Sequence, residues 1–380
     1  MVADVNRLPD ARPPHPGRML RQLLDEKAWT IEDLAAITGY SRTAISAVSA
    51  ERGGVSADMA VALGAAFGNG AADWLRWDAE YQLSLVETDP ASVERRAKLH
   101  DIAPIRDMRK RGWIRETKND RELEDELARF YGSPLLDATP FSLATFRAES
   151  LRDLNPAEKA WCFQARRLAN TIPVAVFDRG RLDAAERKLR QLAAFSQEAK
   201  RLPQALAHFG IRLVIVEPLP GSRIDGAAFW IGESPAIAVS ARWDRVDAFW
   251  FTLVHEFMHI KNDDAYSVDI NLYHEGEAGV AIAADNDAEQ RANDQAADLL
   301  VPKTELESFI RRVSPLYATV RIVQFAHRIR MHPGIIVGQL QHRGELRYSA
   351  HRDLLVKIRA LVTETALTDG WGNSVSPDVV

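Results

Sequence analysis

The sequence predicts a multidomain, mainly α-helical protein with an all-α N-terminal domain, a helical middle region, and a C-terminal α+β domain that holds a small sheet. Three observations support this prediction. The chain has 380 residues, more than the roughly 100–200 residues of one ordinary domain. Apolar side chains recur at helical spacing as far as residue 170. Short β-branched runs, which are typical of strands, first appear after residue 210.

The N-terminal region begins with residues 1–16, which are rich in Pro, Arg and Asp and are expected to form a flexible lead-in. Residues 17–83 then read as short amphipathic helices. Thr30 can cap one helix together with Asp33, and that helix should stop at Gly39. Ser41 can cap a second helix that runs to Ala50. Two helices joined by a short glycine-containing turn form a helix-turn-helix arrangement.

Two more helices are expected in this region, one from Ser56 to near Gly68 and one capped by Asp73. The middle region, residues 84–170, contains further predicted helices at 122–131 and 156–169 but no catalytic motif.

Strand signals begin at residues 211–216 and continue at 227–231 and 236–240, where the last two runs read as a hairpin. Helices should follow at 245–261 and 287–300. We therefore assign residues 171–345 to a C-terminal α+β domain and residues 346–380 to a tail.

Bulk composition gives no signal for a nucleic-acid or membrane partner, because the net charge is −5 and 46% of residues are hydrophobic. The single cysteine, Cys162, excludes an internal disulfide and a cysteine-based metal site; it reads as a small buried residue, with a reactive thiol as the alternative. The N-terminus lacks the apolar segment of a secretory signal, and no apolar run is long enough to span a bilayer. We expect a cytoplasmic protein with no membrane contact.

The chemistry-bearing motif is the pentapeptide HEFMH. On a helix, His255 and His259 project from one face about one turn apart, which lets both imidazoles reach one metal ion. Glu256 follows the first histidine and can act as general base on water. The surrounding positions are apolar, as a water-excluding site requires.

A catalytic zinc site needs a third protein ligand and an open fourth position. Glu289, on the next predicted helix, would complete a His-His-Glu set, and Asn293, one turn later, could hydrogen-bond a ligand histidine. Competing ligands lie in the intervening segment: His274, Glu275, Glu277, Asp285 and Asp287.

The expected reaction is metal-assisted peptide hydrolysis, in which Glu256 takes a proton from water and passes it to the leaving amine. Donors for the oxyanion are not selected by the sequence; the candidates are Tyr266, Tyr273, His274 and His332. Zn²⁺ is the expected cofactor, although Mn²⁺ or Fe²⁺ could occupy similar ligands. A folded but catalytically silent metal site is the alternative.

The run HEFMHI followed by EQRANDQAADLLVP resembles the ImmA/IrrE family of metallopeptidases, whose signature is HExxH and then ExxANxxAxxLLxP. The resemblance implies a zincin-like fold for residues 171–345. It also implies zinc bound by His255, His259 and Glu289, and Glu256 as catalytic base. Known members cleave repressors, which implies a repressor or antitoxin as protein substrate.

Residues 15–75 are similar to XRE-type helix-turn-helix domains, especially the antitoxin-like HigA branch, and residues 332–346 are similar to the end of long proteins that fuse the two parts. In this interpretation Arg42, Thr43 and Ser46 face the major groove of an operator. A homodimer that reads two half-sites would be expected.

Two features weaken the DNA-binding interpretation. Residues 1–83 carry eight basic and eleven acidic side chains, a net charge of −3, whereas phosphate contacts supply much of the affinity of such modules. Ile31 also stands where XRE domains commonly place a phosphate-contacting Gln. A helical domain kept for dimerisation or partner recognition is the alternative.

Two functions from different classes therefore remain. The first is a zinc endopeptidase linked to a DNA-binding domain, which cleaves a regulatory protein in a stress response, a toxin-antitoxin system or a mobile element. The second is a non-proteolytic transcriptional regulator or antitoxin that uses the peptidase-like domain as a sensor or scaffold.

Overall fold

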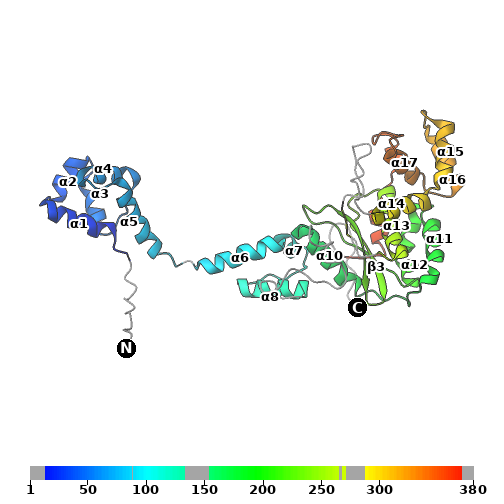
Figure 1. Ribbon diagram of the computed structural model, residues 1–380, viewed down its shortest axis with the longest axis horizontal. Helices are drawn as coiled ribbons and strands as arrows, with labels where there is room; N and C mark the ends of the chain where they lie inside the picture. The colour runs from blue at the N-terminus through cyan, green and yellow to red at the C-terminus, as the bar shows by residue number, and fades with distance from the viewer. Residues whose placement is uncertain (1–12, 88, 133–153, 265–267, 271–286, 370–380) are drawn as a thin grey trace. The chain divides into compact units, whose positions relative to one another are not determined.

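A computed structural model describes residues 13–87, 89–132, 154–264, 268–270 and 287–369, with residues 268–270 described by their backbone alone. Its contacts divide the chain into two compact units, the first ending at Ala91 and the second beginning at Ser92 (Figure 1).

The first unit is all-α, as the sequence predicts. Its helices surround one small core that includes the fully buried Leu20, Leu34, Ile45, Leu63 and Trp74. Burying large apolar side chains in this way is the main stabilising contribution in such a small domain. The helices are α1 (Pro16–Lys27), α2 (Ile31–Thr38), α3 (Arg42–Ser49), α4 (Ala57–Phe67) and α5 (Ala71–Ser84).

The helix-turn-helix pair is built from strong local signals. Thr30 and Asp33 cap α2 reciprocally, and Gly39 ends it in a left-handed conformation with φ of 75°. The Ser41 hydroxyl then accepts a hydrogen bond from the Ala44 backbone N–H at the start of α3. These three predictions are confirmed. They could be made from the sequence because a helix cap depends only on residues near it along the chain.

Two expectations for the first unit are wrong. Asp73 does not cap α5: the helix begins two residues earlier, after Gly70, and Asp73 lies in its first turn. The expected lead-in also ends too late, because His15 is 3% exposed and caps α1 by accepting a hydrogen bond from Gly17 N–H. Residues 1–12 of that lead-in lie outside the described residues.

The second unit contains a mixed sheet with strand order β4-β2-β3-β1-β5. β2 (Ile224–Ile231) and β3 (Ser234–Val239) form the predicted antiparallel hairpin. β1 (Arg212–Ile215) runs parallel to β3, and β4 (Val268–Ile270) pairs antiparallel with β2. Both edges of the sheet are therefore formed by short strands.

Helices cover both faces of this sheet (Figure 1). Along β1, Leu213 and Ile215 belong to one apolar cluster, whereas Val214 and Val216 belong to the other. The first cluster joins the sheet to α11 (Leu182–Leu192), α12 (Leu202–His208), α13 (Val246–Asn262), α14 (Asp287–Leu300), α15 (Lys303–Val313), α16 (Thr319–Ile329) and α17 (Pro333–His342). The second cluster joins it to α6 (Pro90–Ile102), α7 (Ile105–Lys110), α8 (Asp120–Tyr131) and α10 (Pro156–Ala169).

This arrangement differs from the expected boundaries. Residues 84–170 were assigned to a helical linker or middle domain separate from the C-terminal domain, but the described helices of this region after Ser92 share a core with the sheet. For example, the buried Trp161 of α10 donates a hydrogen bond from its indole N–H to Val216 O, 2.6 Å away. A sheet with two apolar faces needs a layer on each side, and these helices supply the second layer.

The expected tail, residues 346–380, also takes part in the fold. It includes α18 (Arg359–Thr363) and the short β5 (Leu367–Thr368), which pairs parallel with β1 at Val214 and Ile215. Residues 370–380 lie outside the described part of the chain.

Cys162 is fully buried on α10, and burial raises the pKa of its thiol. These observations favour the interpretation of Cys162 as a small buried residue over that of a reactive thiol.

None of the described helices has both the length and the apolar character that a bilayer span requires.

Candidate functional site

Helix α13 carries the HEFMH motif and is buried along almost its whole length. Its apolar side chains, including Phe249, Trp250, Leu253 and Phe257, pack between the sheet and α14 and α17. Apolar residues at most positions make it a central helix with almost no face exposed to solvent. The histidines of the motif therefore lie in the interior of the second unit.

The start of α13 is fixed by a buried ion pair. Arg245 Nε and Nη2 lie 3.1 and 2.8 Å from the two carboxylate oxygens of Asp247, and Arg245 Nη2 also donates to Gln341 Oε1. Gln341 belongs to α17, so these contacts attach the first turn of the motif helix to a neighbouring helix. The planar guanidinium is suited to such paired contacts.

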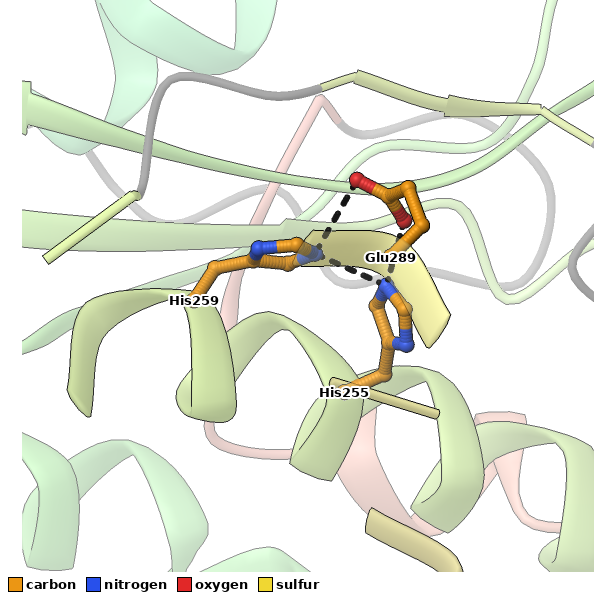
Figure 2. A group of neighbouring side chains, drawn as sticks. All are labelled: His255, His259 and Glu289. Carbon is orange, nitrogen blue, oxygen red and sulfur yellow. Dashed lines mark hydrogen bonds and ion pairs between the residues drawn. The ribbon is translucent and has the colours of Figure 1, made fainter. Parts of the chain in front are cut away.

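Three side chains converge at the centre of this unit (Figure 2). His255 and His259 point from successive turns of α13, and their Nε2 atoms are 2.9 Å apart. Glu289 reaches them from α14, with Oε2 at 3.2 Å from His255 Nε2 and Oε1 at 3.4 Å from His259 Nε2. The two histidines are 0% and 1% exposed. The sequence-predicted ligand set is therefore brought together from two helices, α13 and α14.

The donor set and its spacing fit a divalent zinc ion. Ligand atoms that bind zinc at about 2.0–2.2 Å in tetrahedral geometry are separated from one another by about 3.3 Å. The three separations here, 2.9, 3.2 and 3.4 Å, are close to that value. Two imidazole nitrogens and one carboxylate also match the ligand types of catalytic zinc sites, and three ligands leave a fourth position for a reacting molecule.

The electrostatics of Glu289 also favour a cation here. Burial alone would raise the pKa of this carboxyl, but its hydrogen bonds with His255 and His259 together bring the pKa well below its ordinary value. The carboxylate is thus held ionised beside two buried ring nitrogens. A buried carboxylate is stabilised by a positive charge next to it, and a metal ion bound between Glu289 and the two histidines would supply that charge.

Glu256, the predicted general base, is 0% exposed and lies against strand β2. Its carboxylate occupies the space that the Cβ atom of any side chain at position 226 would need, and this position is a glycine, Gly226. Gly226 is therefore the residue that makes room for the carboxylate, and β2 forms one wall of the site. Sequence reasoning missed Gly226, because nothing along the chain indicates which strand lies against the motif.

Asn293 does not have the role that the sequence suggested. Among the described residues it makes no hydrogen bond to either histidine. Asp264 takes that place, with Oδ1 2.8 Å from His259 Nδ1. Asp264 follows the end of α13 by two residues, and its proximity to His259 depends on the local path of the chain.

Other sequence candidates do not join the ligand group or lie outside the described residues. His332 caps α17, where its Nδ1 accepts a hydrogen bond from Gly334 N–H at 3.0 Å. Asp287 is exposed and does not join the ligand group. The remaining candidates lie outside the described residues: Tyr266, Tyr273, His274, Glu275, Glu277 and Asp285.

In the first unit, the N-terminal turn of α3 presents the predicted DNA-reading side chains. Arg42 and Thr43 are exposed and Ser46 is half-exposed, whereas Ile45 of the same helix is buried in the core. Arg42 Nε lies 2.7 Å from Glu32 Oε1 of α2, and both side chains are largely exposed. A surface ion pair of this kind is weak, so Arg42 remains available to another partner.

The chain was compared with known proteins. No protein-family model matches it, and no curated protein matches it. Several solved structures resemble part of it. Antitoxin GraA is 34% identical over 19% of this chain and 80% of its own, with a TM-score of 0.19.

Two Pseudomonas aeruginosa structures are also similar in part. PA4674, solved in complex with its operator DNA, is 32% identical over 22% of this chain and 94% of its own, with a TM-score of 0.21. Antitoxin HigA, solved with the higBA promoter, is 32% identical over 25% of this chain and 99% of its own, with a TM-score of 0.19. Each of these three matches covers a quarter of this chain or less.

Proposed function

We propose that this protein is a zinc-dependent endopeptidase joined to a helix-turn-helix domain that binds DNA. The observation that carries the peptidase part is the convergence of His255, His259 and Glu289 within 4.8 Å of one another, beside the buried Glu256. Two histidines and a carboxylate that leave one position open on a metal ion, together with a neighbouring carboxylate that can act as base, form the minimal apparatus for metal-assisted amide hydrolysis.

In this proposal a bound zinc ion supplies Lewis-acid activation of the scissile carbonyl and of water. The chain itself supplies the proton transfers. Glu256 takes a proton from the attacking water as its oxygen bonds to the carbonyl carbon, and then gives that proton to the amine nitrogen as the C–N bond breaks. Burial on α13 and the wall formed by β2 keep bulk water away from the carboxylate, which strengthens its interactions with the reacting groups.

The substrate class follows from the resemblance to repressor-cleaving metallopeptidases and from the attached domain. We propose a regulatory protein, either a repressor or an antitoxin, as substrate. A peptidase linked to a DNA-binding domain would be brought close to proteins bound at the same operator, which raises their effective concentration without any new contact.

The exposed Arg42 and Thr43 on the well-capped α3 are also compatible with the non-proteolytic alternative. These side chains have the position expected of a recognition helix, and they would serve a transcriptional regulator equally well with a silent metal centre.

The test is a comparison of wild type with Glu256→Gln. The substitution preserves side-chain volume and leaves the three ligands in place. We expect both proteins to bind one zinc ion per chain, and only wild type to cleave itself or the proteins encoded beside its gene. Equal behaviour of the two zinc-loaded proteins on every candidate would reject the enzyme in favour of the regulator.

The DNA part is tested by gel shift on the protein's own upstream DNA. We expect Arg42→Ala to weaken binding and to relax specificity for one base, because a bidentate Arg–guanine pair contributes about 1–3 kcal/mol of discrimination. Glu32→Gln is the matched control: it removes the acidic partner of Arg42 and should leave binding unchanged or make it tighter. Failure of wild type to shift that DNA would favour a partner-recognition role for the domain.

A further inference from the structure

We propose that Asp264 is a positioning residue of the metal centre that holds two of the three ligands in place at once. This inference rests on the proposed zinc site and adds a residue that neither the motif nor the signature contains. Its basis is a pair of contacts: the Asp264 carboxylate contacts His259 of α13, and it also contacts α14, the helix that carries Glu289.

The first contact fixes His259. Asp264 Oδ1 lies 2.8 Å from His259 Nδ1. A carboxylate can only accept a hydrogen bond, so this contact places a ring proton on Nδ1 and leaves Nε2 as the nitrogen that can bind a metal ion. Nε2 is the atom that faces His255 and Glu289 (Figure 2). Asp264 therefore selects the tautomer that can bind a metal ion at the cluster.

The chain reaches this contact through a sharp turn at the end of α13. Asp263 adopts a left-handed conformation with φ of 66°, which ends the helix. The Asp264 backbone N–H then donates to His259 O at 3.0 Å, while the Asp264 side chain meets the ring of the same residue. Two points of attachment to one residue leave the Asp264 carboxylate little freedom, as a group that orients a ligand requires.

The second contact reaches α14. Arg291 Nη2 donates to Asp264 Oδ2 at 3.1 Å, so each carboxylate oxygen has a different partner. Arg291 is two residues from Glu289 on the same helix. The same carboxylate thus links the ring of His259 to the helix that supplies the third ligand. The Asp264 side chain is 19% exposed and the Arg291 side chain is 52% exposed, so this contact lies at the surface.

The sequence around Asp264 offers a matched control. Asp263 is the adjacent residue and has the same side chain, but its carboxylate pairs with Arg179, away from the ligands. Asn tolerates the left-handed conformation that Asp263 adopts, so Asp263→Asn should preserve the turn.

The experiment measures the dissociation constant of zinc for the full-length protein by competition with a chromophoric chelator. We expect Asp264→Ala to weaken zinc binding about 10- to 100-fold, the usual effect of removing a carboxylate that supports a ligand histidine. Asp264→Asn should weaken it less, because a neutral amide oxygen still accepts a hydrogen bond. Arg291→Met should also produce a smaller loss, and Asp263→Asn should bind as wild type does.

Two further readouts separate positioning from general stability. The urea midpoints of the metal-free proteins should be similar for Asp264→Asn and Asp263→Asn. The visible spectrum of the Co²⁺-loaded protein, which reports ligand geometry, should change only for substitutions of Asp264 and Arg291. If Asp264→Ala does not fold, Asp264→Asn decides the question.

The outcomes also distinguish this inference from the function on which it rests. Wild-type zinc affinity and an unchanged Co²⁺ spectrum in both Asp264 variants would overturn the positioning role and leave the metal centre intact. If wild type itself bound no zinc, the metal centre and the positioning role would both be rejected.

Discussion

Gly226 of β2 gives the sharpest prediction about the proposed catalytic base, because it is the point at which the sheet touches Glu256. A Cβ built at this position would overlap Glu256 Oε1 and would lie 2.8 Å from Thr252 Cγ2. In Gly226→Ala the carboxylate must therefore retreat by about 1 Å to restore ordinary contact. The three atoms nearest to the added Cβ belong to Glu256 and Thr252, and none belongs to a proposed metal ligand.

The expected loss can be estimated from that displacement. A catalytic group misplaced by about 1 Å typically costs about 100-fold in rate, or about 2.7 kcal/mol of transition-state stabilisation. Overpacking of the site should also lower the free energy of unfolding by about 1–3 kcal/mol. Zinc binding should remain stoichiometric.

The assay measures kcat/KM on the substrate identified by its dependence on Glu256, together with zinc content and the urea midpoint. Gly180→Ala is the control, because Gly180 is exposed in the 3-10 turn Arg179–Arg181 and its nearest neighbour is the Asp178 side chain at 3.2 Å. A Gly226→Ala protein that cleaves at the wild-type rate, or that loses its zinc, would refute the placement of Glu256 against β2.

Two pH-dependent predictions concern stability away from the metal centre. A hydrogen bond from Arg115 lowers the pKa of Glu126 to about 2, with burial opposing it and Arg129 reinforcing it. The contribution of the Glu126 carboxylate to the free energy of unfolding is therefore complete above pH 4.5 and is lost as the pH falls through about 2. Glu126→Gln should lower the free energy of unfolding by about 1 kcal/mol at pH 7, and by less at acidic pH. Equal differences at pH 7 and pH 2.5 in urea titrations would contradict this. Burial lowers the pKa of His332, and the nearby Asp247 partly opposes this shift. The neutral ring accepts a hydrogen bond from Gly334 N–H. The contribution of this cap to the free energy of unfolding is therefore complete above pH 6.5 and declines as the pH falls toward the lowered pKa. His332→Asn keeps a capping side chain that does not titrate, so the variant should lose less stability than wild type between pH 8 and pH 5. Urea midpoints that fall equally with pH in the two proteins would contradict the role of His332 in this pH dependence.

Several features of the fold could be predicted from the sequence because their causes are local. The motif helix was expected at residues 245–261 and is observed as Val246–Asn262, and the helix that carries Glu289 has the expected bounds. The spacing of His255 and His259 on one turn follows from helix geometry alone. The caps at Thr30 and Ser41 depend only on neighbouring residues.

Other features depend on segments that are far apart along the chain. Nothing near β5 indicates that Leu367 and Thr368 pair with β1, because a two-residue strand has no periodicity of its own. The continuous apolar run at residues 211–216 is consistent with burial on both faces of a sheet, but it does not identify the helices that cover the second face.

The candidate site shows the same division between local and long-range causes. The ligand types and their order could be read from the sequence. Asn293 was chosen as the supporting residue because it shares a helix face with Glu289, whereas the contact to His259 comes from Asp264. That contact is produced by the left-handed turn at Asp263, which helical spacing cannot reveal. Gly226 was missed for a related reason, since the pairing of β2 with the motif helix is a tertiary contact.

The convergence of three ligands on one ion is tested most directly by the zinc content of purified wild type and of Glu289→Ala. Wild type should hold one zinc ion per chain. The variant should lose it, because only His255 and His259 would remain of the group that spans α13 and α14. Retention of one zinc ion per chain by Glu289→Ala would contradict the proposed centre and place the third ligand elsewhere in the chain.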